Sequence, residues 1–253
     1  MAGIVDKLND ELLRQNFDEA NKEPDDFVSY YEAIAKMYAD VEGAISVLSD
    51  MNSDKSIVYY GSFARELGLS NLNTQESVDS IWEGEVLKRI HTDDLNEKYL
   101  FELRFFHFIK QCPWRKRKYY YLSEKLRMMS STGNFLFVHH RMFYFHSPVN
   151  HSVRFALCLY TPLVYNIPDG ACIVNSFTGA TSLLDNSQDN GILSEREKDV
   201  LRLIGQGMIS KHIARKLFIS INTVSRHRQN ILEKLQVKNS IEACRVAKEL
   251  GII

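Results

Sequence analysis

The sequence has few cysteines, no long apolar run and no motif typical of an enzyme. Its four cysteines (Cys112, Cys158, Cys172 and Cys244) are scattered without CxxC spacing, so they predict neither a disulfide framework nor a metal site. The strongest apolar run, residues 155–160, is far shorter than the ~18–20 residues that a membrane-spanning helix needs. GxSxG, HExxH, P-loop and GxGxxG motifs are absent. We therefore expect a reduced, cytoplasmic protein with no catalytic residues, no metal, no predicted cofactor and no membrane partner.

Net charge of either sign is small, −1 over the 253 residues, but the charged residues are unevenly distributed along the chain. Residues 193–253 contain 12 Lys and Arg against 6 Asp and Glu, a net charge of +6. Residues 1–192 contain 19 against 26, a net charge of −7. A compact basic segment is typical of a polyanion partner, whereas a solvated helical surface without a ligand would explain the same charge. The length allows one or two domains.

Hydrophobic periodicity predicts an α+β fold for the acidic part of the chain. Residues 1–43 have a helical pattern, residues 44–165 mix strands with helices, and residues 166–191 read as a short hairpin followed by a polar linker, DNSQDNG. The expected strands are 44–48, 56–61, 119–129, 135–145 and 152–160, with a long helix near 93–111. The last three strands predict an antiparallel sheet packed by helices.

Residues 192–253 form an all-α pattern, without proline from residue 193 onward. Ser194 and Glu197 have the spacing of a capping box at the start of a first helix. Ser210 and Ser220 can cap a second and a third helix, and Asn239 or Ser240 a fourth. Four helices of this kind, with a tight connection between the second and third, predict a helix-turn-helix domain.

The third of these helices has one polar face that can read DNA. With Val224, Ile231 and Leu235 facing the core, amide, hydroxyl and guanidinium groups lie opposite and can hydrogen-bond base edges. Hydroxyls at the helix start and nearby lysines suit phosphate groups. The predicted DNA-binding residues are Lys211, Ser220, Asn222, Thr223, Ser225, Arg226, Gln229, Asn230 and Lys234. His227 could either pack half-buried, where helix-turn-helix proteins usually have an apolar residue, or contact DNA.

The segment LSEREKDVLRLIGQGMISKHIARKLFISINTVSRHRQNILEKLQVKNSIEA resembles the LuxR-type (GerE) DNA-binding domain of bacterial transcription factors. The resemblance implies a four-helix domain whose third helix enters the major groove and whose fourth helix mediates dimerisation. On the fourth helix the dimerisation residues would be Ile241, Cys244, Arg245 and Lys248. His212 and Ser225 depart from the Glu and Lys usual in that family, which leaves the target sequence open.

Residues 44–163 resemble a PAS domain in the order of their elements. YYGSFARELGLS (59–70) and Ile90-His91-Thr92-Asp93-Asp94 are similar to PAS motifs, with Thr92 in place of a proline. The resemblance implies a sensor that encloses an unidentified small molecule. His107 could ligate haem or simply pack among phenylalanines. The basic run 114–118 could bind an anion or form a solvated loop.

The pattern as a whole predicts a sequence-specific transcriptional regulator, in which a PAS-like domain senses a signal or mediates dimerisation and controls the C-terminal DNA reader. Its expected partners are double-stranded DNA, a second copy of the chain and RNA polymerase. Two alternatives stay open at this point: a sigma-like promoter-recognition factor, and a ligand-binding protein with a dimerising helical tail.

Overall fold

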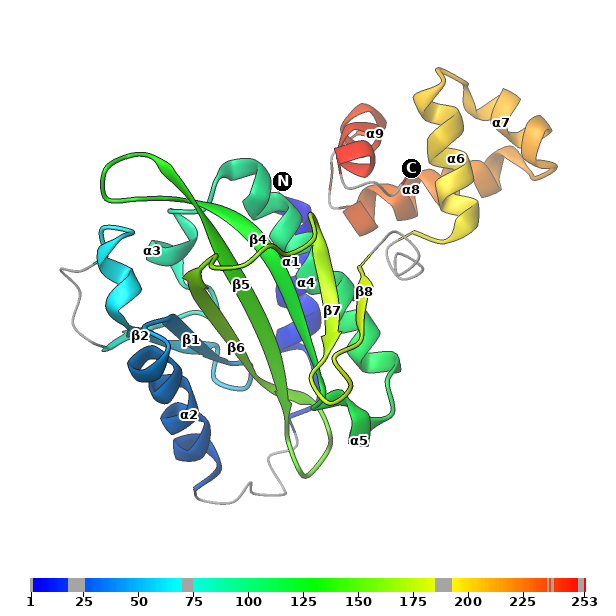
Figure 1. The fold of residues 1–253 in the computed structure, drawn as a ribbon. Helices are drawn as coiled ribbons and strands as arrows, with labels where there is room; N and C mark the ends of the chain where they lie inside the picture. Colours follow the sequence, from blue (N-terminus) through cyan, green and yellow to red (C-terminus); the bar gives the residue numbers. More distant parts are fainter. Residues whose placement is uncertain are drawn as a thin grey trace. The chain divides into compact units, whose positions relative to one another are not determined.

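A computed structural model describes residues 2–17, 26–69, 75–184, 193–235, 237, 239–249 and 253 (Figure 1). Within these ranges no helix has both the length and the apolar character needed to cross a membrane. The predicted linker at 185–191 lies outside the described residues. The sheet-containing part and the C-terminal helices are taken in turn.

Two helices precede the sheet, α1 (Ala2–Leu13) and α2 (Phe27–Val41), as the helical pattern of residues 1–43 predicts. Ile4, Leu8 and Leu12, four residues apart, form the buried stripe of α1. In α2 the small residues Ala35 and Ala39 are buried and allow a close approach to the sheet.

One antiparallel sheet of eight strands, in the order β3-β2-β1-β6-β5-β4-β7-β8, forms the centre of this part (Figure 1). The strands are β1 (Ile45–Asp50), β2 (Lys55–Tyr60), β3 (Gln75–Val78), β4 (Tyr120–Met129), β5 (Phe135–His146), β6 (Val153–Pro162), β7 (Ala171–Asn175) and β8 (Thr181–Leu183). The expected domain end at residue 165 is wrong, because β7 pairs with β4 over five residues and so makes the hairpin part of the sheet. The short strand β3, with the polar sequence QESV, gives no periodic signal and was not predicted.

The sheet is buried on both faces in its centre. On the face covered by α2, Leu48, Phe155, Leu157 and Leu159 make a core cluster with the two alanines of that helix (Figure 1). On the other face the register places Tyr160 opposite both Ile45 and His140, and these side chains are also buried. Burial on both faces explains why β6 is a continuous apolar run.

The short helix η1 (Ser62–Arg65) lies between β2 and β3. Three helices connect β3 to β4: α3 (Gly84–Leu87), α4 (Thr92–Gln111) and α5 (Trp114–Arg117). Asp94, in the first turn of α4, accepts hydrogen bonds from the Arg127 backbone N–H (2.6 Å) and the Arg127 Nε (3.0 Å). Burial raises the pKa of Asp94, but the bonds from Arg127 outweigh it, so that this pKa lies below its ordinary value. The aspartate of the PAS-like sequence at 90–94 therefore anchors the start of α4 to β4.

The basic run 114–118 is not a solvated loop, because Trp114–Arg117 form a helical turn. The Arg117 side chain donates hydrogen bonds to the carbonyls of Cys112 (3.0 Å) and His151 (3.1 Å). The Trp114 ring stacks on His151 with centroids 4.3 Å apart. These contacts indicate a structural role for Trp114 and Arg117.

The C-terminal helices are α6 (Glu195–Gly205), α7 (Ser210–Leu217), α8 (Ile221–Leu235) and α9 (Ser240–Glu249). Apolar side chains from all four are buried: Val200, Leu201, Leu203, Ile213, Ala214, Val224, Ile231, Leu235, Ala243 and Ala247. The capping box of Ser194 and Glu197 is present. Ser220 accepts from the Thr223 backbone N–H, and Asn239 accepts from that of Glu242. Ser210 is not a cap, because the N-cap position of α7 is Ile209 and Ser210 is already helical.

Candidate nucleic-acid interface

The connection between α7 and α8 is short and rigid. Phe218 has a left-handed backbone (φ 57°), which lets the chain reverse between the two helices. The Ile219 backbone N–H donates to the Ala214 carbonyl (3.0 Å), and Ser220 then caps α8. A tight turn of this kind holds the start of α8 clear of α7, which is the geometry of a helix-turn-helix.

The predicted reading face of α8 is exposed. Its members are Asn222, Ser225, Arg226 and Gln229. Val224, Ile231 and Leu235 occupy the opposite, buried face, as the periodicity predicts. Ser220 is exposed at the helix start and its hydroxyl lies 2.8 Å from that of Thr223. Asn230 and His227 are partly buried, and within the described residues His227 Nδ1 has no hydrogen-bond partner.

Basic side chains in this domain fall into two groups. One group contacts no hydrogen-bond or ion-pair acceptor among the described residues and is exposed to solvent: Lys211, Arg215, Lys216, Arg226 and Lys248. All but Lys248, which is on α9, lie on α7 or on the first half of α8. The acidic residues of α6, by contrast, pair with cations within the domain, for example Glu195 with Lys198 and Asp199 with Arg202. Uncompensated positive charge therefore concentrates on the helix-turn-helix.

Lys234 belongs to the second group, the basic side chains that pair with an acceptor inside the domain. Its predicted role was that of a phosphate contact. Its Nζ donates to Glu197 Oε2 at 2.6 Å, and the same oxygen accepts the Ser194 backbone N–H at 2.7 Å. The Glu197 side chain is only 3% exposed. Burial raises the pKa of Glu197, but the hydrogen bonds from Lys234 and Ser194 outweigh it and hold this pKa below its ordinary value. Lys234 thus joins α8 to the start of α6.

Arg228 makes a comparable link that was not predicted. Its guanidinium donates to the Ser210 hydroxyl on α7 (3.2 Å) and to the Ser240 hydroxyl on α9 (3.0 Å). Arg226 and Arg228 are two positions apart on one helix and point to different surroundings, which explains how one can read DNA while the other fixes the helix.

Residues 191–247 match the family model described as "GerE: Bacterial regulatory proteins, luxR family". This segment is a luxR-family domain. The chain is 42% identical over 72 residues to the oxygen regulatory protein NreC of Staphylococcus carnosus, and 49% identical over 59 residues to the transcriptional regulatory protein DesR of Bacillus subtilis. The matches cover 28% and 23% of this chain and 33% and 30% of those proteins, so the chain spans about a third of the length of these relatives.

Among solved structures, that of the phage VqmA-DPO complex aligns over 89% of this chain and 91% of its own, with 14% identity and a TM-score of 0.33. A TM-score of this size does not indicate a shared fold.

The predicted dimerisation residues on α9 of the luxR-family domain do not share one surface. Ile241 is 85% exposed, and Arg245 and Lys248 are also exposed. Cys244 instead turns inward, where its Sγ–H donates to the Leu201 carbonyl (3.7 Å) and lies beside Gly205. The Cys244 side chain therefore faces α6, unlike the exposed side chains of the other three residues.

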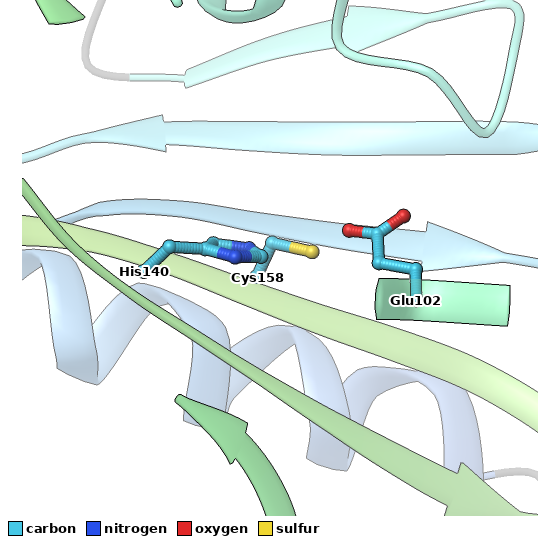
Figure 2. Close-up of side chains that lie close together, drawn as sticks. All are labelled: Glu102, His140 and Cys158. Atoms are coloured by element: carbon cyan, nitrogen blue, oxygen red, sulfur yellow. The ribbon is translucent and has the colours of Figure 1, made fainter. Parts of the chain in front are cut away.

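A second group of chemically reactive side chains lies in the sheet-containing part, where none was predicted. Figure 2 shows Glu102 of α4, His140 of β5 and Cys158 of β6, whose ligand atoms all lie within 4.8 Å of one another. All three are buried. His140 Nδ1 is also 2.7 Å from Glu124 Oε1 on β4. Separations of 38 and 18 residues along the chain give no motif spacing, so only pairing of the strands reveals this cluster.

A further histidine, His139, lies on β5 next to His140. Its ring nitrogens are within hydrogen-bond distance of the Ser123 and Tyr165 hydroxyls (2.8 and 3.1 Å). Burial, followed by the nearby charge of Arg141, lowers the pKa of His139 to about 4, so that the ring is neutral at pH 7. The alternation of β5 sends His139 and His140 to opposite faces. His107, the candidate haem ligand, is partly buried on α4, with its ring centroid 6.4 Å from that of Phe106.

Proposed function

We propose that the protein is a sequence-specific transcriptional regulator that places α8 of its luxR-family domain in the major groove of double-stranded DNA. The observation behind this is the exposed face of α8, bordered by four cations without an acidic partner among the described residues. Arg226, Asn222 and Gln229 have the side chains that recognise guanine and adenine edges. Names of the relatives, a transcriptional regulatory protein among them, support the same reading.

Phosphate contacts come from the start of α8 and from α7. Ser220, Thr223 and the free N–H groups of the first turn of α8 suit an oxyanion, and Lys211, Arg215 and Lys216 add positive charge. In the free protein the Gln229 amide donates to Glu233 (3.0 Å), so reading a base with Gln229 requires this bond to be exchanged. Lys234 keeps its partner Glu197 and is left out of the interface.

The sheet-containing part is proposed to be a PAS-like sensor that acts on the DNA reader, in a homodimer working in the cytoplasm with RNA polymerase as a further partner. The chain order of two strands, a long helix and three long antiparallel strands supports this assignment. The β-rich architecture disfavours a sigma-like factor, and no enzymatic activity is proposed.

The test is selection of DNA sites from a random library by the full-length protein, followed by binding measurements at several salt concentrations. Arg226→Ala is expected to lose roughly 1–3 kcal/mol on the selected site and to relax its specificity. Lys216→Ala is expected to weaken selected and random DNA alike and to reduce the salt slope by about 0.9. Failure to retain any DNA at low salt would support the tail-dimerisation alternative and overturn the proposal.

A further inference from the structure

Three potential ligands of different chemistry converge inside the sheet-containing part. Glu102 contributes a carboxylate oxygen, His140 an imidazole nitrogen and Cys158 a thiol sulfur, all within 4.8 Å of one another (Figure 2). Their residues are 3%, 0% and 6% exposed. The sheet register explains part of this arrangement: His140 lies opposite Tyr160, so Cys158, two residues earlier on β6, is its diagonal neighbour on the same face.

The imidazole of His140 is held as metal-binding histidines usually are. Its Nδ1 is 2.7 Å from Glu124 Oε1, and a carboxylate on one ring nitrogen directs the other toward a metal and increases its basicity. The ring also stacks on Tyr160 with centroids 4.8 Å apart, and the Tyr160 hydroxyl donates to Glu83 (2.6 Å). The stacking on Tyr160 and the contact with Glu124 therefore fix the plane of the His140 ring before any ligand arrives.

We propose that Glu102, His140 and Cys158 bind one divalent transition-metal ion of the zinc type, with Glu124 orienting His140. A mixed set of one oxygen, one nitrogen and one sulfur fits Zn²⁺ and excludes Mg²⁺ and Ca²⁺, which take oxygen ligands. Three protein ligands leave the fourth tetrahedral position of the ion for water or a small molecule.

The distances and charges fit such an ion after a small adjustment. Bond lengths of about 2.0–2.3 Å around tetrahedral zinc place ligand atoms roughly 3.3–3.6 Å apart. Side-chain rotations that move the ligand atoms by about 1 Å would therefore bring all three within bonding distance of one ion. Zinc displaces the thiol proton, which leaves the thiolate of Cys158 beside the carboxylate of Glu102. The two positive charges of the ion balance the two negative charges of these ligands.

Cobalt provides a direct probe, because Co²⁺ occupies zinc sites and gives a thiolate charge-transfer band. The full-length protein, freed of metal with a chelator, is titrated first with Co²⁺ and then with Zn²⁺ in competition. We expect one equivalent of Co²⁺ to produce the band and one equivalent of Zn²⁺ to abolish it. Absence of the band, or a stoichiometry set by adventitious surface sites, overturns the proposal.

Matched variants identify the ligands. Cys158→Ser is expected to lose the band, whereas Cys172→Ser, a similarly buried cysteine on β7, keeps it. Glu102→Gln is expected to lower Zn²⁺ affinity at least tenfold. Glu124→Gln is expected to lower it 10- to 100-fold while the band remains. A band that persists in Cys158→Ser, or is lost in Cys172→Ser, refutes the ligand set.

Folding and DNA binding are measured separately. Circular dichroism shows whether each variant folds. If His140→Gln does not fold, its Zn²⁺ affinity cannot be measured, and the Zn²⁺ affinity of Glu124→Gln tests the role of the imidazole in its place. DNA binding by the same preparations requires the luxR-family domain alone and is not needed for the cobalt result. A protein that binds DNA but no metal therefore refutes this site and leaves the proposed function intact. A protein that binds the metal but no DNA supports this site and refutes the proposed function.

Discussion

Removal of the Lys234 charge tests whether this side chain stabilises the luxR-family domain or contacts DNA. In Lys234→Met the apolar stem is retained, but Glu197 Oε2 loses its bond at 2.6 Å and keeps only the Ser194 backbone N–H. Breaking a fully buried ion pair costs about 3–5 kcal/mol, and an exposed pair contributes about 0–1 kcal/mol. Because Glu197 is 3% and Lys234 40% exposed, we expect a loss of about 1–2 kcal/mol.

Hydrogen exchange in the full-length protein measures this loss in α6 and α8 without a separate fragment. A loss of 1–2 kcal/mol corresponds to roughly 5- to 30-fold faster exchange of their protected amides. Lys216→Met is the matched control, since the exposed Lys216 side chain has no acidic partner among the described residues. In this variant we expect exchange within about twofold of the unsubstituted protein, while the salt slope of DNA binding falls by about 0.9. In the double variant with Glu197→Gln, protection is partly restored because no buried charge is left. If Lys234→Met leaves exchange unchanged and lowers the salt slope instead, Lys234 contacts phosphate and our reasoning is refuted.

Three further predictions concern individual contacts. Arg228→Met removes the bonds to Ser210 and Ser240, so exchange in α7 and α9 is expected to accelerate about tenfold, and unchanged protection would show that the link is dispensable. Asp94→Asn weakens the anchor to Arg127 and should lower the thermal midpoint of the sheet-containing part by several degrees. Both tryptophans precede residue 185, so their fluorescence monitors this unfolding. An unaltered midpoint contradicts the anchoring role. Because the pKa of Glu197 is lower in the folded state, the stability from its contacts is complete above the unfolded pKa, about 4.3, and is lost as the pH falls through the folded value. Protection factors in α6, which relate exchange to the intrinsic rate at each pH, should fall under acid conditions, and constant protection factors would argue against this role of Glu197.

Local patterns were sufficient to predict most of the fold. The long helix α4 and the three long strands follow from periodicities of 3.6 and 2, which burial on one side imposes on the sequence. The strand β3 was missed because its four residues, three of them polar, lie at the sheet edge and have no buried face to mark them. The domain end at residue 165 was misplaced because the pairing of β7 with β4 joins residues about fifty positions apart, and nothing local to β7 specifies that partner.

The reading face of α8 could be predicted from the same helical periodicity of apolar residues that predicts the helix itself. Asn222, Ser225, Arg226 and Gln229 are exposed because three apolar residues on the same helix must be buried. The partners of the other polar residues could not be predicted. Ser210 has the residue type of a cap, yet it receives a hydrogen bond from Arg228, eighteen positions away. Cys244 occupies a helical position suited to either surface, and the neighbouring Leu201 decides which.

The same distinction explains what net charge reveals about the luxR-family domain. Its +6 is an excess over all basic residues, but those that pair with Glu195, Glu197 or Asp199 have their charge compensated within the fold. A polyanion is attracted chiefly by the remainder, and among the described residues most of that remainder lies on α7 and the first half of α8, with Lys248 on α9 in addition. Composition therefore predicts that the domain binds an anion, whereas only the internal ion pairs show which surface does so. By this reasoning, a substitution on α6 that frees Lys234 would add positive charge away from the reading face and increase binding to random DNA more than binding to the selected site.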